Sequence, residues 1–482
     1  MSNIFFNISK IRVHVLIAVL FCCSTYSFAQ NGNLNYIPPA GSVPDSINKS
    51  SLLSSPKVSD AANPGANQYL SLQQCIEYAM KHQPGLNVSL INVDVARATN
   101  KIALAGWLPQ LNASGNFIHT IQSSNSNISN SNGNTNQSKG SDANSFVPGV
   151  ALSQAIFSPS LLYAYRSAPL YIQQANQVTD STKIFLVSSV SKSFYNVLLT
   201  LEQINVLKED TARLGKNLRD AYHQYKGGIV DETDYEEAEI TLNNSMAQLK
   251  QANENVVPQY ASLKRLMGFP PEQQFNVNFD TLEMMRSIHI DTAQQLQYEK
   301  RIEFQQIKTE KDLQNEQINY YKFSFLPTLS AFYNYNLAYG SNSISNLFVT
   351  PYPSSLIGVS FTIPIFTGFA RLQNLRKARL EEKIIDWHQV DLKSQIYSEY
   401  TAALANYKSN FYNLSLLQRN VALAKRTYFV VTLQYRQGIV AYLNVITAES
   451  NLITSEISYL NALFQVLSNK IDLQKAMGNI SY

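Results

Sequence analysis

The sequence predicts a mainly helical fold in which one unit, made of a helix, two strands and a long helical hairpin, occurs twice. Three observations lead to this prediction. Short segments recur in the same order at a nearly constant separation. Apolar and polar residues alternate over two pairs of short segments, and apolar residues recur every three or four positions over four long segments.

The composition excludes several classes of protein. The chain has 482 residues, a net charge of +4 and only 15% charged residues against 45% hydrophobic ones. A charge-rich disordered chain is therefore excluded, and without a long basic block no nucleic-acid partner is expected. The 3 cysteines and 6 scattered histidines offer neither a disulfide framework nor a metal-ligand spacing. We expect no cofactor, no metal and no enzyme activity.

Residues 1–29 have the features of a secretory signal peptide. Two basic residues precede the apolar stretch 13–23, and small residues then lead to a cleavage site that ends at Ala29. An N-terminal anchor helix fits less well, because the apolar stretch is too short to span a bilayer. Whether Cys22 or Cys23 carries a lipid is left open.

The mature chain contains the same unit twice. Four segments recur in order, the first pair 218 positions apart and the others 209 or 210: WLPQL at 107–111 and FLPTL at 325–329, GVALSQAIF at 149–157 and GVSFTIPIF at 358–366, QYKGGIV at 224–230 and QYRQGIV at 434–440, RLMG at 265–268 and KAMG at 475–478. We therefore expect a flexible leader at 30–68, which is rich in Pro, Ser, Asn and Gly, a first repeat at 69–270 and a second at 271–482.

Each repeat ends in a predicted helical hairpin, at about 160–267 and about 369–477. From Val187 onward the apolar positions are mostly three and four residues apart, as in the seam of a coiled coil. The longer arm of each hairpin would measure roughly 100 Å at 1.5 Å per residue. Pro169 should kink or delay the first long helix, and Pro258 should bend the returning one. A helical spacer would show the same pattern.

Four strands are predicted at about 110–121, 147–157, 328–338 and 356–366, each with one apolar and one polar face. This length and alternation suit a transmembrane β-barrel, although a soluble sandwich alternates too. Of the 26 residues at 120–145, 15 are Ser or Asn, so this loop must be solvated. Long polar loops on one side are typical of the outer face of an outer-membrane barrel.

The number of strands predicts an oligomer. Four strands cannot close a membrane barrel, since the smallest have about eight. An open strand edge is not tolerated in lipid, because each unpaired backbone group costs several kcal/mol there. The barrel must therefore be shared, and three chains would supply twelve strands above a barrel of long helices.

The segment LSLQQCIEYAMKHQPGLNVSLINVDVARATNKIALAGWLPQL at 70–111, together with the two Q-Y-x-x-G-I-V turns, resembles the TolC family of outer-membrane efflux channels. The resemblance extends over about 70–478. It implies a homotrimer with a twelve-stranded barrel in the lipid of the outer membrane and an α-helical tunnel across the periplasm.

The resemblance further implies a passive exit duct, which opens when a periplasmic adaptor of the membrane-fusion type docks beneath it. An inner-membrane pump, either an RND-type or an ABC transporter, would act through the adaptor and supply the energy. Drug efflux and type I protein secretion are not separated by the sequence, since the duct takes part in both.

The resemblance assigns the two hairpin turns to the periplasmic end and to the adaptor. The matching residues are Gly227, Gly228, Ile229, Val230, Gly438, Ile439 and Val440. Glycine permits a tight turn and the close approach of another chain. The alternative is that these residues only cap the ends of the helices.

Five further positions are candidates for the entrance. Tyr435 matches a family position that lines the closed entrance. Asn444 and Thr447 stand where well-studied members carry acidic residues that narrow the pore, and Asp234 and Glu237 are the matching positions of the other repeat. Because one hairpin lacks the acidic pair, a strongly cation-selective gate is in doubt. The acidic residues are also consistent with a solvated helix face near a helix N-terminus.

Two other classes of protein stay open at this point. A soluble periplasmic spacer or adaptor would use the long helices without a barrel. A secreted enzyme, such as a glycan hydrolase, would need a carboxylate pair or a nucleophile in a cleft, and no residues can be nominated for either.

Overall fold

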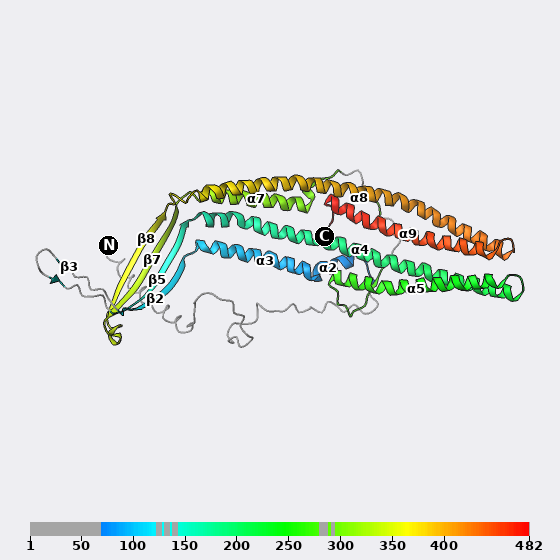
Figure 1. The fold of residues 1–482 in the computed structure, drawn as a ribbon, viewed down its shortest axis with the longest axis horizontal. Coiled ribbons are helices and arrows are strands. Elements are labelled where there is room, and N and C mark those ends of the chain that lie inside the picture. The colour runs from blue at the N-terminus through cyan, green and yellow to red at the C-terminus, as the bar shows by residue number, and fades with distance from the viewer. Residues whose placement is uncertain are drawn as a thin grey trace, which may run out of the picture. The chain divides into compact units, whose positions relative to one another are not determined.

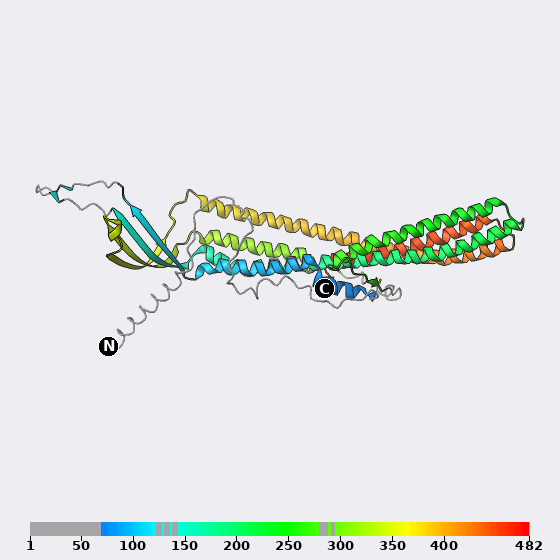
Figure 2. The same ribbon diagram turned by 90° about the horizontal axis from the view of Figure 1, so that it is seen from below.

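The computed structural model describes residues 69–121, 128–129, 135–136, 143–278, 288–290 and 295–481. The predicted signal peptide at 1–29 and leader at 30–68 lie outside the described residues, as does most of the Ser- and Asn-rich loop. Among the described residues, a four-stranded sheet lies at one end of the long helices and the turns of both helical hairpins lie at the other (Figures 1 and 2).

The first repeat begins with two helices instead of one. Gln83 is extended, with ψ 121°, because a residue that precedes proline avoids the helical region, and Pro84 then starts the second helix. The elements in order are β1 (Tyr69–Leu70), α2 (Leu72–His82), α3 (Pro84–Leu104), the 3-10 helix η1 (Ala105–Trp107), β2 (Gln110–His119), the short pair β3 (Ile128–Ser129) and β4 (Thr135–Asn136), β5 (Asn144–Phe157), α4 (Pro159–Lys226) and α5 (Glu232–Met267).

The second repeat has the same order of long elements. They are β6 (Asn276–Val277), η2 (Tyr298–Lys300), α7 (Ile302–Phe323), β7 (Thr328–Ser341), η3 (Ile344–Asn346), β8 (Pro351–Thr362), α8 (Ala370–Arg436) and α9 (Tyr442–Met477). Strand β6 pairs in parallel with β1, which joins the start of each repeat. The predicted duplication of a helix, two strands and a long hairpin is therefore present in the structure.

Two prolines lie inside the long helices of the first repeat. Helix α4 runs without a break from Pro159 through Pro169 to Lys226, so Pro169 does not delay its start. Helix α5 likewise continues through Pro258. The predicted delay of the first long helix is therefore wrong, while the kink at Pro169 and the bend at Pro258 stay predictions.

The main sheet has the strand order β2-β5-β7-β8, and all its pairs are antiparallel. The register brings the apolar positions of the four strands into line, since Leu111 pairs with Leu152, Leu152 with Tyr333, and Tyr333 with Ile357. Side chains at paired positions lie on one face of a sheet. The predicted apolar face is therefore continuous across strands from both repeats.

The bounds of β7 and β8 differ from the prediction. Strand β8 spans Pro351–Thr362 and not 356–366, although apolar residues go on alternating through Ile365. Pro364 has no N–H for the ladder, so the alternation outlasts the strand. Strand β7 extends to Ser341, beyond the predicted end at 338. Part of the segment between β7 and β8 packs on the sheet, because the ring centroids of Phe348 and Phe146 lie 5.6 Å apart.

The largest core lies where α2, α4, α5, α8 and α9 meet. Its fully buried members include Cys75, Val190, Leu263, Val466 and Leu473. One face of α4 continues this core as the predicted seam: Val187, Val190, Phe194, Val197, Ile204, Leu214 and Ala221 are all buried. An 18-residue window of α4 is apolar enough to cross a bilayer, but 56% of it is buried inside the protein, as in the core helix of a helical bundle.

Candidate functional site

The turn of the first hairpin follows α4. Gly228 has a φ of +71°, and its N–H donates to the carbonyl of Tyr225, while the N–H of Ile229 donates to the carbonyl of Gln224. These two bonds define a Schellman motif, which satisfies the last carbonyls of a helix and favours glycine at the left-handed position. The backbone at Gly228 is thus determined by helix capping.

The second hairpin repeats this turn. Gly438 also has a φ of +71° and donates to the carbonyl of Tyr435, and the N–H of Ile439 donates to the carbonyl of Gln434. Gly227 is different, because its φ is −79° and the matching position of the second hairpin is Gln437. The capping alternative therefore accounts for Gly228 and Gly438 and does not require a glycine at 227.

Exposed apolar side chains stand at both turns. Ile229 is 76% exposed and Ile439 is 69% exposed. No atom lies within 4 Å of a Cβ built on Gly228 or Gly438, so the outer side of both turns is open. Val230 and Val440 are half-buried, and Val440 packs against an apolar cluster that includes Tyr435 and Tyr442.

Tyr435 lies between the two hairpins within one chain. It is 9% exposed, packs with Ala221, Ala238, Tyr442 and Val445, and donates a hydrogen bond of 2.6 Å to Oε1 of Gln224. Burial, and then the negative charge of Asp234, raise the pKa of Tyr435 to about 12, so its hydroxyl keeps the proton that it donates.

The other entrance candidates lie on the returning helices. Asn444 and Thr447 are exposed on α9, and Glu237 is exposed on α5, whereas Asp234 is half-buried. Burial, and then the charge of Asp231, raise the pKa of the Asp234 carboxyl. Asp234 thus lies close enough to Tyr435 for its charge to raise the tyrosine pKa. Asn444, Thr447 and Glu237 are instead exposed at the surface of the chain.

Gln224 was missed by the sequence reasoning. It is the first residue of Q-Y-K-G-G-I-V, and Gln434 is its counterpart in the other repeat. Only Gln224 accepts the bond from Tyr435. The recurrence of Gln in both motifs was the available signal.

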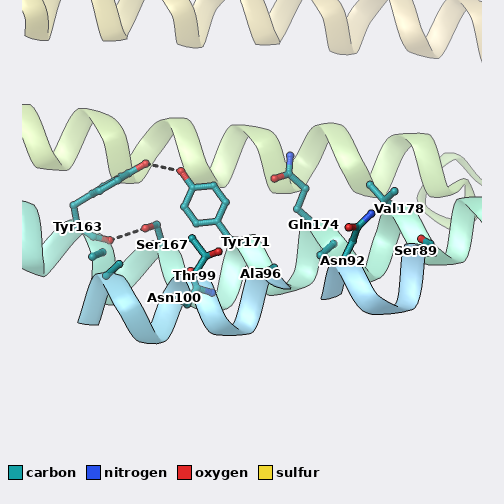
Figure 3. Close-up of a pocket in the computed structure, with 13 residues that line it drawn as sticks. Ser89, Asn92, Ala96, Thr99, Asn100, Tyr163, Ser167, Tyr171, Gln174 and Val178 are labelled. Carbon is teal, nitrogen blue, oxygen red and sulfur yellow. Dashed lines mark hydrogen bonds between the residues drawn. The ribbon is translucent and has the colours of Figure 1, made fainter. Parts of the chain in front are cut away.

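A groove of about 560 Å³ lies elsewhere, between α3 and α4 (Figure 3). Small side chains such as Ala96 and Ala164 line it, with a hydrogen bond of 3.0 Å between the hydroxyls of Tyr163 and Tyr171. Ser167 donates to the carbonyl of Tyr163 at 2.8 Å. The lining contains no charged side chain, so the groove offers shape and hydrogen bonds but no acid–base pair.

The sequence profile described as "Outer membrane efflux protein" matches residues 75–269 and 294–479. The two matched segments correspond to the two repeats and cover more than half of the chain. The chain belongs to the outer membrane efflux protein family. It is an outer-membrane efflux channel, with its sheet in the membrane and its helices in the periplasm.

Curated relatives of this outer membrane efflux protein are distant. The outer membrane protein TolC of Escherichia coli is 20% identical over 432 residues, which cover 86% of this chain and 83% of the relative. TolC of Vibrio cholerae is 22% identical over 226 residues, which cover 46% of this chain and 51% of the relative. The chain thus spans about half the length of the Vibrio cholerae protein in that alignment.

Solved structures share the fold. CusC has a TM-score of 0.71 at 20% identity, with 84% of this chain and 91% of CusC covered. The outer-membrane channel CmeC of Campylobacter jejuni has a TM-score of 0.67 at 20% identity, with 93% and 94% covered. VceC of Vibrio cholerae has a TM-score of 0.67 at 15% identity, with 84% and 96% covered.

Proposed function

We propose that three copies of this outer membrane efflux protein form a passive exit duct through which an inner-membrane pump expels its substrates. The observation that carries this proposal is the open sheet. Strand β2 pairs only with β5, and β8 pairs only with β7, so each end of the four-stranded sheet has an unpaired edge among the described strands. In lipid such edges must pair, and β2 of one chain with β8 of the next would close a twelve-stranded barrel.

The long helices support an assembly. Large apolar side chains are exposed along α8, and Leu380, Ile384 and Trp387 follow one another at helical spacing with exposures of 52%, 53% and 73%. A stripe of this kind marks a surface that is covered in the working protein. A second copy of the chain is the occupant that the sheet edges already require.

The hairpin turns support docking of a periplasmic adaptor. Ile229 and Ile439 are exposed at the tips, and the outer sides of Gly228 and Gly438 are open. Exposed apolar residues on rigid capped turns suit a helical partner surface. Adaptor binding at the tips would open the entrance, and an RND-type or ABC transporter would supply the energy, with no chemical step in the channel itself.

The oligomer is tested by purifying the full-length protein from outer membranes in mild detergent. We expect the mass of three chains, a heat-sensitive β-sheet signal and conductance in a planar lipid bilayer. A purified protein that stays monomeric and does not conduct would contradict the proposal.

The docking surface is tested by crosslinking. Ile229→Cys and Ile439→Cys should each form a crosslink with the cognate adaptor in cells, whereas Ile240→Cys, 59% exposed on α5, serves as the matched control away from the turn. Equal crosslinking at all three positions would exclude the tips as the specific docking surface.

A further inference from the structure

Two carboxylates are buried together where the hairpins of the two repeats meet. Asp210 on α4 is 0% exposed and Glu449 on α9 is 1% exposed. The guanidinium of Arg213 lies between them, with Nη2 at 3.3 Å from Oδ1 of Asp210 and Nε at 3.5 Å from Oε1 of Glu449. One positive charge thus faces two potential negative charges across the α4–α9 interface.

The two carboxylates do not accept the same number of hydrogen bonds. Asp210 accepts a hydrogen bond of 2.7 Å from the hydroxyl of Ser245 on α5 and a second bond from Arg213. Glu449 accepts one bond of 3.0 Å at Oε2, from the side-chain amide of Asn217. Its Oε1 is buried and has no hydrogen-bond partner. A proton therefore fits Glu449 better than Asp210.

The other charged and titratable groups around the cluster come from three helices, α4, α8 and α9. Glu209 on α4 lies 4.0 Å from Arg213 and is well exposed, and the ring of Tyr428 on α8 lies 6.0 Å from the guanidinium. Glu456 on α9 pairs with Lys425 of α8 at 3.0 Å. Burial, and then the negative charge of Glu449, raise the pKa of Tyr442 on α9. No further cation among the described residues pairs with Glu449, so its ionisation leaves a net negative charge in the interface.

We propose that Asp210, Arg213 and Glu449 form a proton-dependent clamp between the two hairpins. With a proton on Glu449 the cluster is neutral, and α4 and α9 pack tightly. When Glu449 loses the proton, an uncompensated negative charge is buried between the helices, and their packing loosens because a buried charge without a partner is costly.

The electrostatics agree with this geometry. Burial, and then the negative charge of Asp210, raise the pKa of Glu449 to about 7, against the opposing effects of Arg213 and Asn217. A carboxyl whose pKa is higher in the folded than in the unfolded state makes the fold more stable at low pH than at high pH. This contribution is complete below the ordinary value of 4.5 and is lost as pH rises to about 7.

The clamp is a property of the helices and does not depend on transport. Its effect on the channel, an entrance that is easier to open above neutral pH, rests on the proposed function. The test therefore measures hairpin stability, and a failure of the exit-duct proposal would leave its outcome unchanged.

The experiment compares thermal unfolding of the purified full-length protein with that of Glu449→Gln at about pH 5.5 and about pH 8. Glutamine mimics the protonated acid, so the variant's Tm should exceed that of the wild type by a small margin at the lower pH, where only part of the contribution is lost. At the higher pH the margin should grow by on the order of 5 °C. The control is Glu236→Gln, an exposed neutralisation on α5 of the same pair of hairpins, which should shift Tm equally at both values.

A second variant and a direct measurement guard against misfolding of the first. Asp210→Asn removes the like charge and should also abolish the wild type's loss of Tm with pH. Infrared difference spectra of the wild type between the two pH values should show loss of a carboxylic-acid carbonyl stretch that Glu449→Gln lacks. An unchanged pH slope in both variants, or no such band in the wild type, would overturn the clamp.

Discussion

The hydroxyl of Tyr435 on α8 donates a hydrogen bond of 2.6 Å to Oε1 of Gln224 on α4. Each residue belongs to the Q-Y-x-x-G-I-V motif of its own repeat, one turn before the tip. The bond therefore ties the tip of one hairpin to the tip of the other in the same chain. It lies beside the turns that we propose as the docking surface for the adaptor.

Tyr435→Phe should loosen the tips. The substitution removes the donor and leaves Oε1 of Gln224 without a partner in a half-buried position, which costs about 1 kcal/mol. We expect the single-channel conductance of the purified protein to rise and its Tm to fall slightly. Tyr412→Phe, at a tyrosine that is 67% exposed on α8, is the control. An identical conductance for all three proteins would show that the bond does not restrain the tips.

The two turn glycines should be sensitive and their neighbour tolerant. Alanine at Gly228 or Gly438 must adopt a φ of +71°, which costs about 1–2 kcal/mol, whereas Gly227→Ala keeps an ordinary φ of −79°. In thermal unfolding, the Tm of Gly228→Ala and that of Gly438→Ala should lie well below the Tm of Gly227→Ala. Loss of the same size at Gly227 would mean that close approach of another chain, and not the turn, decides this position.

Gly358 on β8 should not accept a side chain. A Cβ at this position would lie 2.7 Å from Cζ of Phe332 on the paired strand, so the ring must swing away and lose its contact with the sheet. Gly358→Val should lower barrel stability by about 1–3 kcal/mol. Ser360→Val lies on the same face two residues on and is the control. Heat-modifiable migration measures the difference, and equal behaviour of the two variants would contradict the packing.

The thiol of Cys75 should be inert in the folded protein. Burial raises its pKa from 9.0 to about 12, which lowers the thiolate fraction about a thousandfold. Alkylation should proceed only after denaturation, whereas the thiol of Ile229→Cys should react at once. Fast labelling of the native wild type would show that the helices around Cys75 open readily.

Much of the architecture follows from local pattern. The spacing of apolar residues predicted the two long hairpins that α4 with α5 and α8 with α9 form, because a long helix with an apolar seam has few other ways to bury it. The end of β8 was predicted wrongly, since Ile363 and Ile365 continue an alternation that Pro364 interrupts. The apolar alternation favours a longer strand, whereas Pro364 cannot donate a hydrogen bond to the neighbouring strand, and the strand ends before it.

The candidate site was predictable only in part. The turns recur as a motif, so their place at the tips could be read from the sequence, while the bond from Tyr435 to Gln224 could not. Asp210, Arg213 and Glu449 gave no signal, because two of them are ordinary charges on a helical pattern and the third lies more than two hundred positions away.

The amino-acid order by itself determined the repeat, the helical seams, the strand faces and the capped turns, because each depends on residues close together in the chain. The tertiary structure alone decided which buried charges share a cation and which tyrosine meets which amide. Those contacts join α4 to α8 and α9, and a periodic pattern specifies the face that a helix buries but not the polar partner that it meets there.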